Sequence, residues 1–76
     1  MENIKVFNEL WNLYSSFLAT NKAQLSNEKL EDMAFECRDK FVRDSSKITK
    51  TPFSNEELLE AYNIVDLFLK ANKSIL

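Results

Sequence analysis

The chain has 76 residues, with ten basic and twelve acidic side chains and a formal net charge of −2. This length predicts one domain, residues 1–76, and the charge does not favour general nucleic-acid binding, which requires a basic surface. The sequence contains no glycine, no histidine, one proline and one cysteine. Sheets with tight glycine turns and glycine-rich phosphate loops are therefore excluded, and the commonest general base and metal ligand is missing.

Apolar residues make up 45% of the chain, which is enough for a core. We therefore predict an all-α protein, a small three-helix bundle with helices at about 4–20, 27–44 and 55–72 and a longer loop at 45–53. No segment approaches 18 consecutive apolar residues, so no membrane span is expected. We expect a cytoplasmic protein with no cofactor, no metal and no small-molecule substrate.

The first predicted helix carries apolar side chains at spacings of three and four, which places them on one side: Ile4, Phe7, Trp11, Tyr14 and Leu18, with Leu10 and Phe17 assigned to the same side. Val6 and Leu13 lie on the flank of this stripe and widen the apolar arc to roughly half of the helix circumference. An arc of this width suits contact with two neighbouring helices, or with one helix and an outside partner, including a second copy of the chain.

The ends of the first helix carry two asparagines. Asn3 is the expected N-cap, and Asn21 is the expected residue for a left-handed C-terminal position. The second helix has a clear start, with Ser26 as N-cap, and its core side is predicted to hold Leu30, Met33, Ala34, Cys37 and Phe41. We predict a loop over 45–53 because this segment is rich in Ser, Thr and Lys and contains Pro52. Ile48 is expected to fold back onto the core.

The third helix has the strongest start signal in the chain. Ser54 and Glu57 have the spacing of a capping box, in which each side chain caps the backbone of the other residue. The apolar positions that follow are predicted to face the core: Leu58, Ala61, Tyr62, Ile64, Val65, Phe68 and Leu69.

Catalytic chemistry has few candidates in this sequence. Cys37 has no histidine partner and is expected to be a small buried apolar residue. Four acidic residues follow one side of the second helix: Glu28, Asp32, Glu36 and Asp39. They could hold a hard cation, but charged helix surfaces usually face solvent, and Lys40 and Arg43 offset part of this charge. We therefore predict that the protein is not an enzyme.

Two residues of the second helix break its amphipathic pattern. Phe35 and Val42 are seven positions apart and point roughly 120–150° away from the core stripe. Charged residues surround them, as in a small protein-binding patch. A neighbouring helix or the 45–53 loop could cover them instead. The partner-binding candidates are Phe35, Val42, Arg38, Glu31, Trp11 and Leu67.

These features favour a small non-enzymatic protein–protein interaction module that occludes the surface of a partner. Inhibitors, immunity proteins, antirepressors and adaptors are of this kind, and the partner is another protein or a second copy of the chain. The alternative is a nucleic-acid-associated transcriptional regulator that uses the basic cluster at 38–50: Arg38, Lys40, Arg43, Lys47 and Lys50. Asp39 and Asp44 dilute that cluster, so nucleic acid is the less favoured partner.

Overall fold

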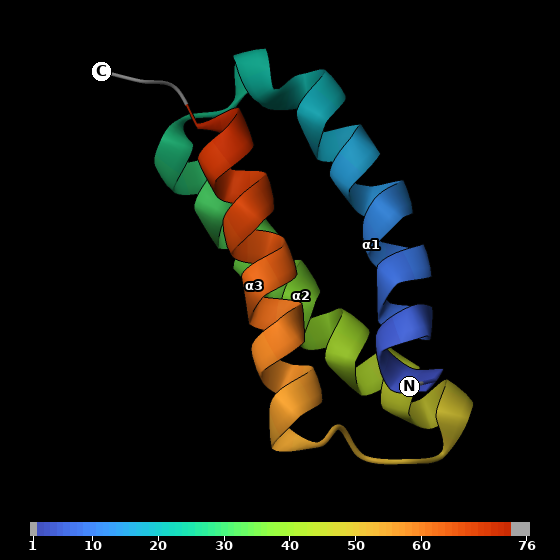
Figure 1. Cartoon of the computed structure of the whole chain (residues 1–76). Helices are drawn as coiled ribbons and strands as arrows, with labels where there is room; N and C mark the ends of the chain where they lie inside the picture. Colours follow the sequence, from blue (N-terminus) through green and yellow to red (C-terminus); the bar gives the residue numbers. More distant parts are fainter. Residues whose placement is uncertain (1, 74–76) are drawn as a thin grey trace.

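The computed structural model describes residues 2–73, and they form three α-helices. Helix α1 spans Glu2–Asn21, α2 spans Asn27–Thr49 and α3 spans Asn55–Asn72, and a short 3₁₀ helix, η1 (Lys22–Gln24), joins α1 to α2. The chain runs up α1, down α2 and up α3, so sequential helices are antiparallel (Figure 1). The predicted all-α three-helix bundle is confirmed. The described part is elongated, with extents of 40 × 19 × 15 Å.

The core draws on all three helices. The buried apolar side chains are Phe7, Trp11 and Leu18 of α1, Leu30, Ala34, Cys37 and Phe41 of α2, and Ala61, Val65 and Leu69 of α3. Small and large residues share this core, since Ala34 of α2 and Ala61 of α3 are both fully buried, and the aromatic rings of Phe7 and Trp11 enter it from α1.

Two of the predicted helix starts are confirmed. The Ser26 hydroxyl accepts a hydrogen bond from the Lys29 backbone N–H, and α2 begins at Asn27, directly after Ser26. At α3 both halves of the capping box form, because the Ser54 hydroxyl accepts from the Glu57 N–H at 3.2 Å and the Glu57 carboxylate accepts from the Ser54 N–H at 3.1 Å. These bonds satisfy backbone donors that the first helical turn leaves without partners.

The second helix is longer than predicted. It continues to Thr49, so the expected loop over 45–53 shrinks to residues 50–54. The hydroxyl groups of Ser46 and Thr49 donate to the carbonyls of Val42 and Ser45, four residues back, at 3.0 Å each. These hydroxyl groups therefore find their hydrogen-bond acceptors within the helix itself. Ser45, expected in the loop, is fully buried.

The predictions for the ends of α1 are wrong at both asparagines. Asn3 lies inside the helix, which starts at Glu2, and its side chain is buried. Asn21 has φ −101° and ψ 5°, because the chain continues into η1 and no left-handed residue is needed there. Within residues 2–73 the left-handed conformation occurs at Lys50 alone, with φ 59°, where α2 ends and the chain turns towards α3.

Several apolar side chains lie on the surface. The large ones that are exposed are Leu13, Phe17, Ile48, Leu59, Tyr62 and Leu67. Phe17 was expected to face the core, but it lies at the edge of the apolar arc of α1 and is 60% exposed. Ile48 does not fold back, because it belongs to the extended last turns of α2 and is held beside Lys5 and Val6 of α1. Tyr62, also expected to face the core, is 45% exposed, and its ring lies over the guanidinium group of Arg38.

Candidate partner-binding surface

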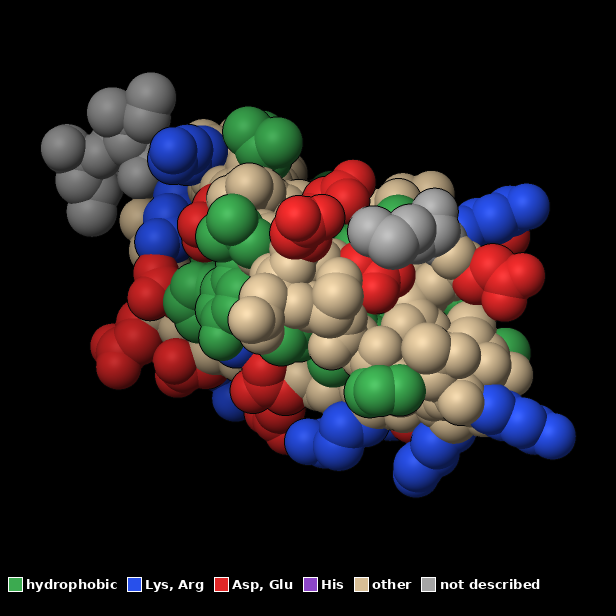
Figure 2. All heavy atoms as spheres, turned by 60° about the horizontal axis from the view of Figure 1, so that its bottom comes forward, with side chains coloured by type: hydrophobic (Ala, Val, Ile, Leu, Met, Phe, Trp, Pro, Cys, Tyr) green, Lys and Arg blue, Asp and Glu red, His purple; other side chains and the backbone are tan. Residues whose placement is uncertain are grey.

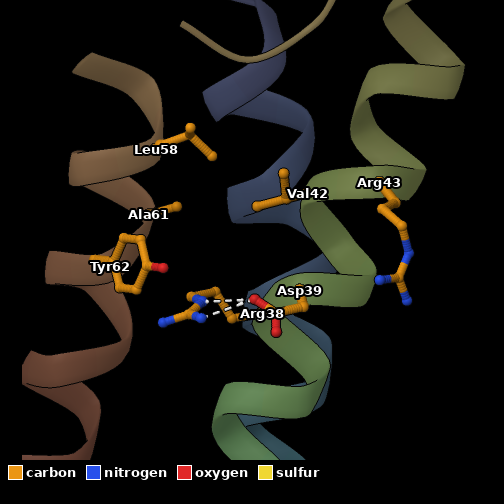
Figure 3. Close-up of a pocket in the computed structure, with 7 residues that line it drawn as sticks. All are labelled: Arg38, Asp39, Val42, Arg43, Leu58, Ala61 and Tyr62. Carbon is orange, nitrogen blue, oxygen red and sulfur yellow. Dashed lines mark hydrogen bonds and ion pairs between the residues drawn. The ribbon is translucent and has the colours of Figure 1, made fainter. Parts of the chain in front are cut away.

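A hollow of about 250 Å³ lies between α2 and α3. Seven residues line it, four from α2 and three from α3: Arg38, Asp39, Val42, Arg43, Leu58, Ala61 and Tyr62 (Figure 3). We call this hollow the α2–α3 groove. Its floor is apolar, because Val42, Leu58 and Ala61 point into it, and its lower edge is formed by the side chains of Arg38 and Tyr62 (Figure 3).

Arg38 is held in place by three contacts. Its guanidinium carbon lies 3.7 Å from the centroid of the Tyr62 ring and 5.2 Å from that of Phe35. The guanidinium also forms an ion pair with Asp39 at 2.7 Å, and only 11% of the Arg38 side chain is exposed. Cation–π contacts contribute about 0.5–2 kcal/mol each, depending on how far the charge is desolvated. Arg38 is therefore an ordered cation that joins α2 to α3.

The groove combines features that protein-binding surfaces share. An apolar floor can receive one apolar side chain of a partner, and Tyr62 offers a rigid ring beside it. The Arg38–Asp39 pair presents both hydrogen-bond donors and acceptors at the edge. Arg43 extends away from the groove on the outer side of α2 and is exposed (Figure 3). It could contact a partner that overlaps the rim.

The structure separates the six predicted partner-binding residues. Arg38 and Val42 line the groove, and Phe35 is half-buried against the core beside Arg38. Glu31 forms an ion pair with Lys73, which joins α2 to the end of α3. The remaining two residues do not line the groove. Trp11 is buried in the core at 3% exposure, and Leu67 is exposed elsewhere on α3.

Sequence reasoning missed Tyr62 as a surface residue. Its place in the apolar pattern of α3 suggested a core position, although it lies at the border of that pattern and carries a hydroxyl group. The spacing of Phe35 and Arg38, three residues apart on one helix, was an available signal for a cation–π pair. The contact of Arg38 with Tyr62 had no sequence signal, because it depends on how α2 and α3 are positioned.

The predicted basic cluster divides into two parts. Lys40, Arg43 and Lys47 are exposed at spacings of three and four, so they follow one outer face of α2, and Lys50 is exposed just beyond it. Arg38 does not join them, because it lies between two aromatic rings and pairs with Asp39. In Figure 2, which brings the loop end of the bundle forward, several Lys and Arg side chains lie along the lower edge.

Cys37 is 7% exposed, as expected for a core residue. Burial is the main reason that its pKa is raised to about 11; the Lys40 ammonium opposes this rise, and the Glu36 and Asp44 carboxylates add to it. Burial also raises the pKa of the neighbouring Tyr14, with smaller contributions from Cys37 and Glu36. The thiol is therefore protonated near neutral pH, and a protonated thiol is a poor nucleophile.

The acidic side chains of α2 do not converge. Within residues 2–73, no three carboxylate or thiol groups come close enough together to hold one metal ion. Asp39 pairs with Arg38, while Glu28, Asp32 and Glu36 are exposed. None of the described helices combines the length and apolarity that are needed to cross a membrane.

Comparisons of the chain with protein-family models, with curated proteins and with solved structures found no match. The functional assignment therefore depends on the surface chemistry of the bundle.

Proposed function

We propose that this protein is a small, cytoplasmic, non-enzymatic protein–protein interaction module that acts by occluding a surface of its partner. Inhibitors, immunity proteins, antirepressors and adaptors work in this way. The observation that supports this most is the α2–α3 groove, where an apolar floor lies beside an exposed tyrosine and a fixed arginine. Tyrosine and arginine are the residues that most often dominate the binding energy of protein interfaces.

The groove suggests what the partner presents. Its floor has room for a single apolar side chain, and the exposed Arg43, on the outer side of α2, favours a carboxylate in the part of the partner that extends beyond the groove. Arg38 is already neutralised by Asp39, so it would orient the partner through hydrogen bonds more than through net charge. We therefore infer that the partner segment is apolar with an acidic neighbour.

The test is affinity capture from a lysate of the source organism, read by mass spectrometry, with and without nuclease. We expect the wild-type chain to retain one protein in stoichiometric amount under both conditions. Tyr62→Ala should reduce the amount captured at least about tenfold, since truncation of a hot-spot side chain costs 2 kcal/mol or more. Circular dichroism of the variant should still show the wild-type helix content.

Leu67→Ala is the matched control, because Leu67 is an exposed apolar residue of the same helix that does not line the groove. It should leave the captured amount unchanged. If both variants reduced the captured amount equally, the role of the groove would be contradicted. If the wild-type chain captured no protein, the proposal itself would be contradicted.

The second candidate function is a nucleic-acid-associated transcriptional regulator, which the exposed face of Lys40, Arg43 and Lys47 supports. Binding through three or four phosphate contacts would weaken about 40–150-fold between 50 and 200 mM salt. A titration of duplex DNA at these two salt concentrations tests it. Binding that is insensitive to salt, or capture that survives nuclease, would contradict this alternative.

A further inference from the structure

The apolar floor of the α2–α3 groove is one helical turn long. Val42 contributes to it from α2, and Leu58 and the fully buried Ala61 contribute from α3. Four residues from Val42 and from Leu58, towards the loop that joins the two helices, the side chains are the polar hydroxyl groups of Ser46 and Ser54. The groove therefore offers apolar contact to one side chain of a partner, and this contact does not continue towards the loop.

The floor is equally short in the other direction, where the stacked side chains of Arg38 and Tyr62 form the lower edge of the groove (Figure 3). Arg38 lies four residues before Val42, and Tyr62 lies four residues after Leu58, so both occupy the next turn of their helices. An amphipathic helix that docks in a groove inserts side chains at positions i, i+3 or i+4, and i+7, which span about 10 Å. The floor is too short for such a row of side chains, and this disfavours a helical partner segment.

The lower edge also has free hydrogen-bonding groups. The Arg38 guanidinium donates from Nε at 3.1 Å and from Nη2 at 2.7 Å, and both bonds end on Oδ1 of Asp39. The Asp39 side chain is 58% exposed, so its second oxygen, Oδ2, is open to a partner. Within residues 2–73, the one buried side-chain polar atom without a hydrogen-bond partner is Oγ of Ser45. The third guanidinium nitrogen, Nη1, is therefore reached by solvent and can donate to a partner.

A free donor beside a free acceptor is complementary to an extended backbone. In a helix the backbone N–H and C=O groups bond to each other, whereas in an extended segment they point sideways and are unpaired. Arg38 can donate from Nη1 to a carbonyl of such a segment, and Asp39 can accept from an N–H through Oδ2. Side chains alternate along an extended segment, so a side chain that enters the groove is flanked by two that point away from it.

We propose that the α2–α3 groove binds an extended segment of a partner protein, which inserts one apolar side chain between Val42 and Leu58 and bonds through its backbone to Arg38 and Asp39. This proposal rests on the proposed function, because it describes the ligand of the same groove. The two can fail separately, since a partner that docks a helix on the groove would leave the function intact and remove the extended segment.

Selection of random linear peptides on the full chain tests the proposal. We expect the selected peptides to share one apolar residue, to carry an acidic residue, and to lack apolar residues at the spacing i, i+3 or i+4, and i+7. Circular dichroism of a mixture of chain and peptide should show no gain in helix content. The affinity for the Tyr62→Ala variant should be lower by about tenfold or more.

N-methylation of the peptide tests the backbone contact, because a methylated amide has no N–H to donate. When each amide is methylated in turn, one position close to the apolar residue should weaken binding by about tenfold or more, since the lost hydrogen bond is to a charged group. The same methylation should have little effect on binding to Asp39→Ala, which lacks the acceptor. Asp32→Ala is the matched control, because Asp32 is exposed on the same helix outside the groove, and it should leave the loss unchanged.

Peptides with the helical spacing of apolar residues that gain helix content on binding would overturn the extended segment and leave the groove as the binding surface. A methylation loss that is equal for the wild-type chain and Asp39→Ala would overturn the proposal as well. So would a selection that enriches no peptide, or peptides that bind Tyr62→Ala as tightly as the wild-type chain. Capture from the lysate decides the proposed function separately in each of these cases.

Discussion

Asn3 joins the start of α1 to the end of α2 and to the loop that follows. Its amide nitrogen donates to the Thr51 and Pro52 carbonyls at 3.1 and 3.2 Å, and its amide oxygen accepts from the Thr49 hydroxyl, whose single hydrogen is shared with the Ser45 carbonyl. The residue is 3% exposed. A side-chain amide has two donor hydrogens and an accepting oxygen, so one side chain satisfies three groups at the closed end of the bundle.

Asn3→Ala should lower the free energy of unfolding by about 1–3 kcal/mol, because it removes a buried amide that bonds two loop carbonyls and a hydroxyl. Urea denaturation followed by circular dichroism measures this change. Asn12→Ala is the matched control, since Asn12 is exposed on the same helix and alanine favours helices by a few tenths of a kcal/mol. Similar losses in the two variants would show that the buried contacts of Asn3 contribute little.

Residue types predicted the caps of α2 and α3 because a cap is a local interaction over three or four residues. Asn3 could not be interpreted in this way. Asparagine can serve either as a helix cap or as a buried polar residue. The partners that decide the role of Asn3 are Thr49, Thr51 and Pro52, which lie more than 45 positions away in the chain. The prediction that Asn3 is an N-cap followed local preference, which the tertiary contacts override.

At the scale of the elements, the length of α2 decides how the bundle closes. Its last five residues were expected to form a loop because Ser and Thr compete for backbone hydrogen bonds. Within the helix, however, the hydroxyl groups of Ser46 and Thr49 donate to carbonyls four residues back, and Ser45 is fully buried. The helix then ends where Lys50 takes the left-handed conformation.

Lys50→Gly should raise the free energy of unfolding by about 1 kcal/mol, since a non-glycine residue in this conformation costs roughly 1–2 kcal/mol and glycine regains part of it. Thermal and urea denaturation measure the gain. Lys47→Gly is the matched control, because the same substitution three residues earlier lies within the helix and should cost about 1 kcal/mol. A loss at both positions would contradict the role given to Lys50.

At the scale of the whole molecule, one aromatic cluster joins the helices. The fully buried Phe7 ring stacks on Trp11 at 6.4 Å and makes edge contacts with Phe41 of α2 at 6.2 Å and with Phe53 of the loop at 6.5 Å. Trp11 in turn meets Phe68 of α3 at 5.4 Å. Such edge and stacked pairs add about 0.5–1.5 kcal/mol each beyond the area that they bury.

Phe7→Ala should cost about 3–5 kcal/mol. A domain of this size has a total free energy of unfolding of roughly 4–11 kcal/mol, so the variant should be largely unfolded or close to it. Phe17→Ala removes the same side chain from the same helix but at an exposed position, and it should change stability by less than about 1 kcal/mol. Melting curves of both variants at low concentration test the contrast, and equal effects would contradict the assignment of Phe7 to the core.

The candidate groove was predictable only in part. Phe35 and Val42 broke the pattern of their helix, and this local signal pointed to the α2 side of the groove, which Val42 and Arg38 line. Leu58, Ala61 and Tyr62 form the other side and followed the regular pattern of α3, so their residue types gave no sign of a shared hollow. A groove between two helices depends on their relative rotation and distance, which residue periodicity along one helix does not encode.

The sequence by itself determined the helical class, the number of helices, the starts of α2 and α3 and most of the core. These features depend on periodicity, on capping side chains and on the absence of glycine, all of which act within a few residues. Only the tertiary structure decided that Asn3 is buried, that α2 reaches Thr49, that Arg38 lies against Tyr62 and that Phe17 faces solvent. Each of these depends on which helix faces lie against each other, and packing sets that arrangement among residues that are distant along the chain.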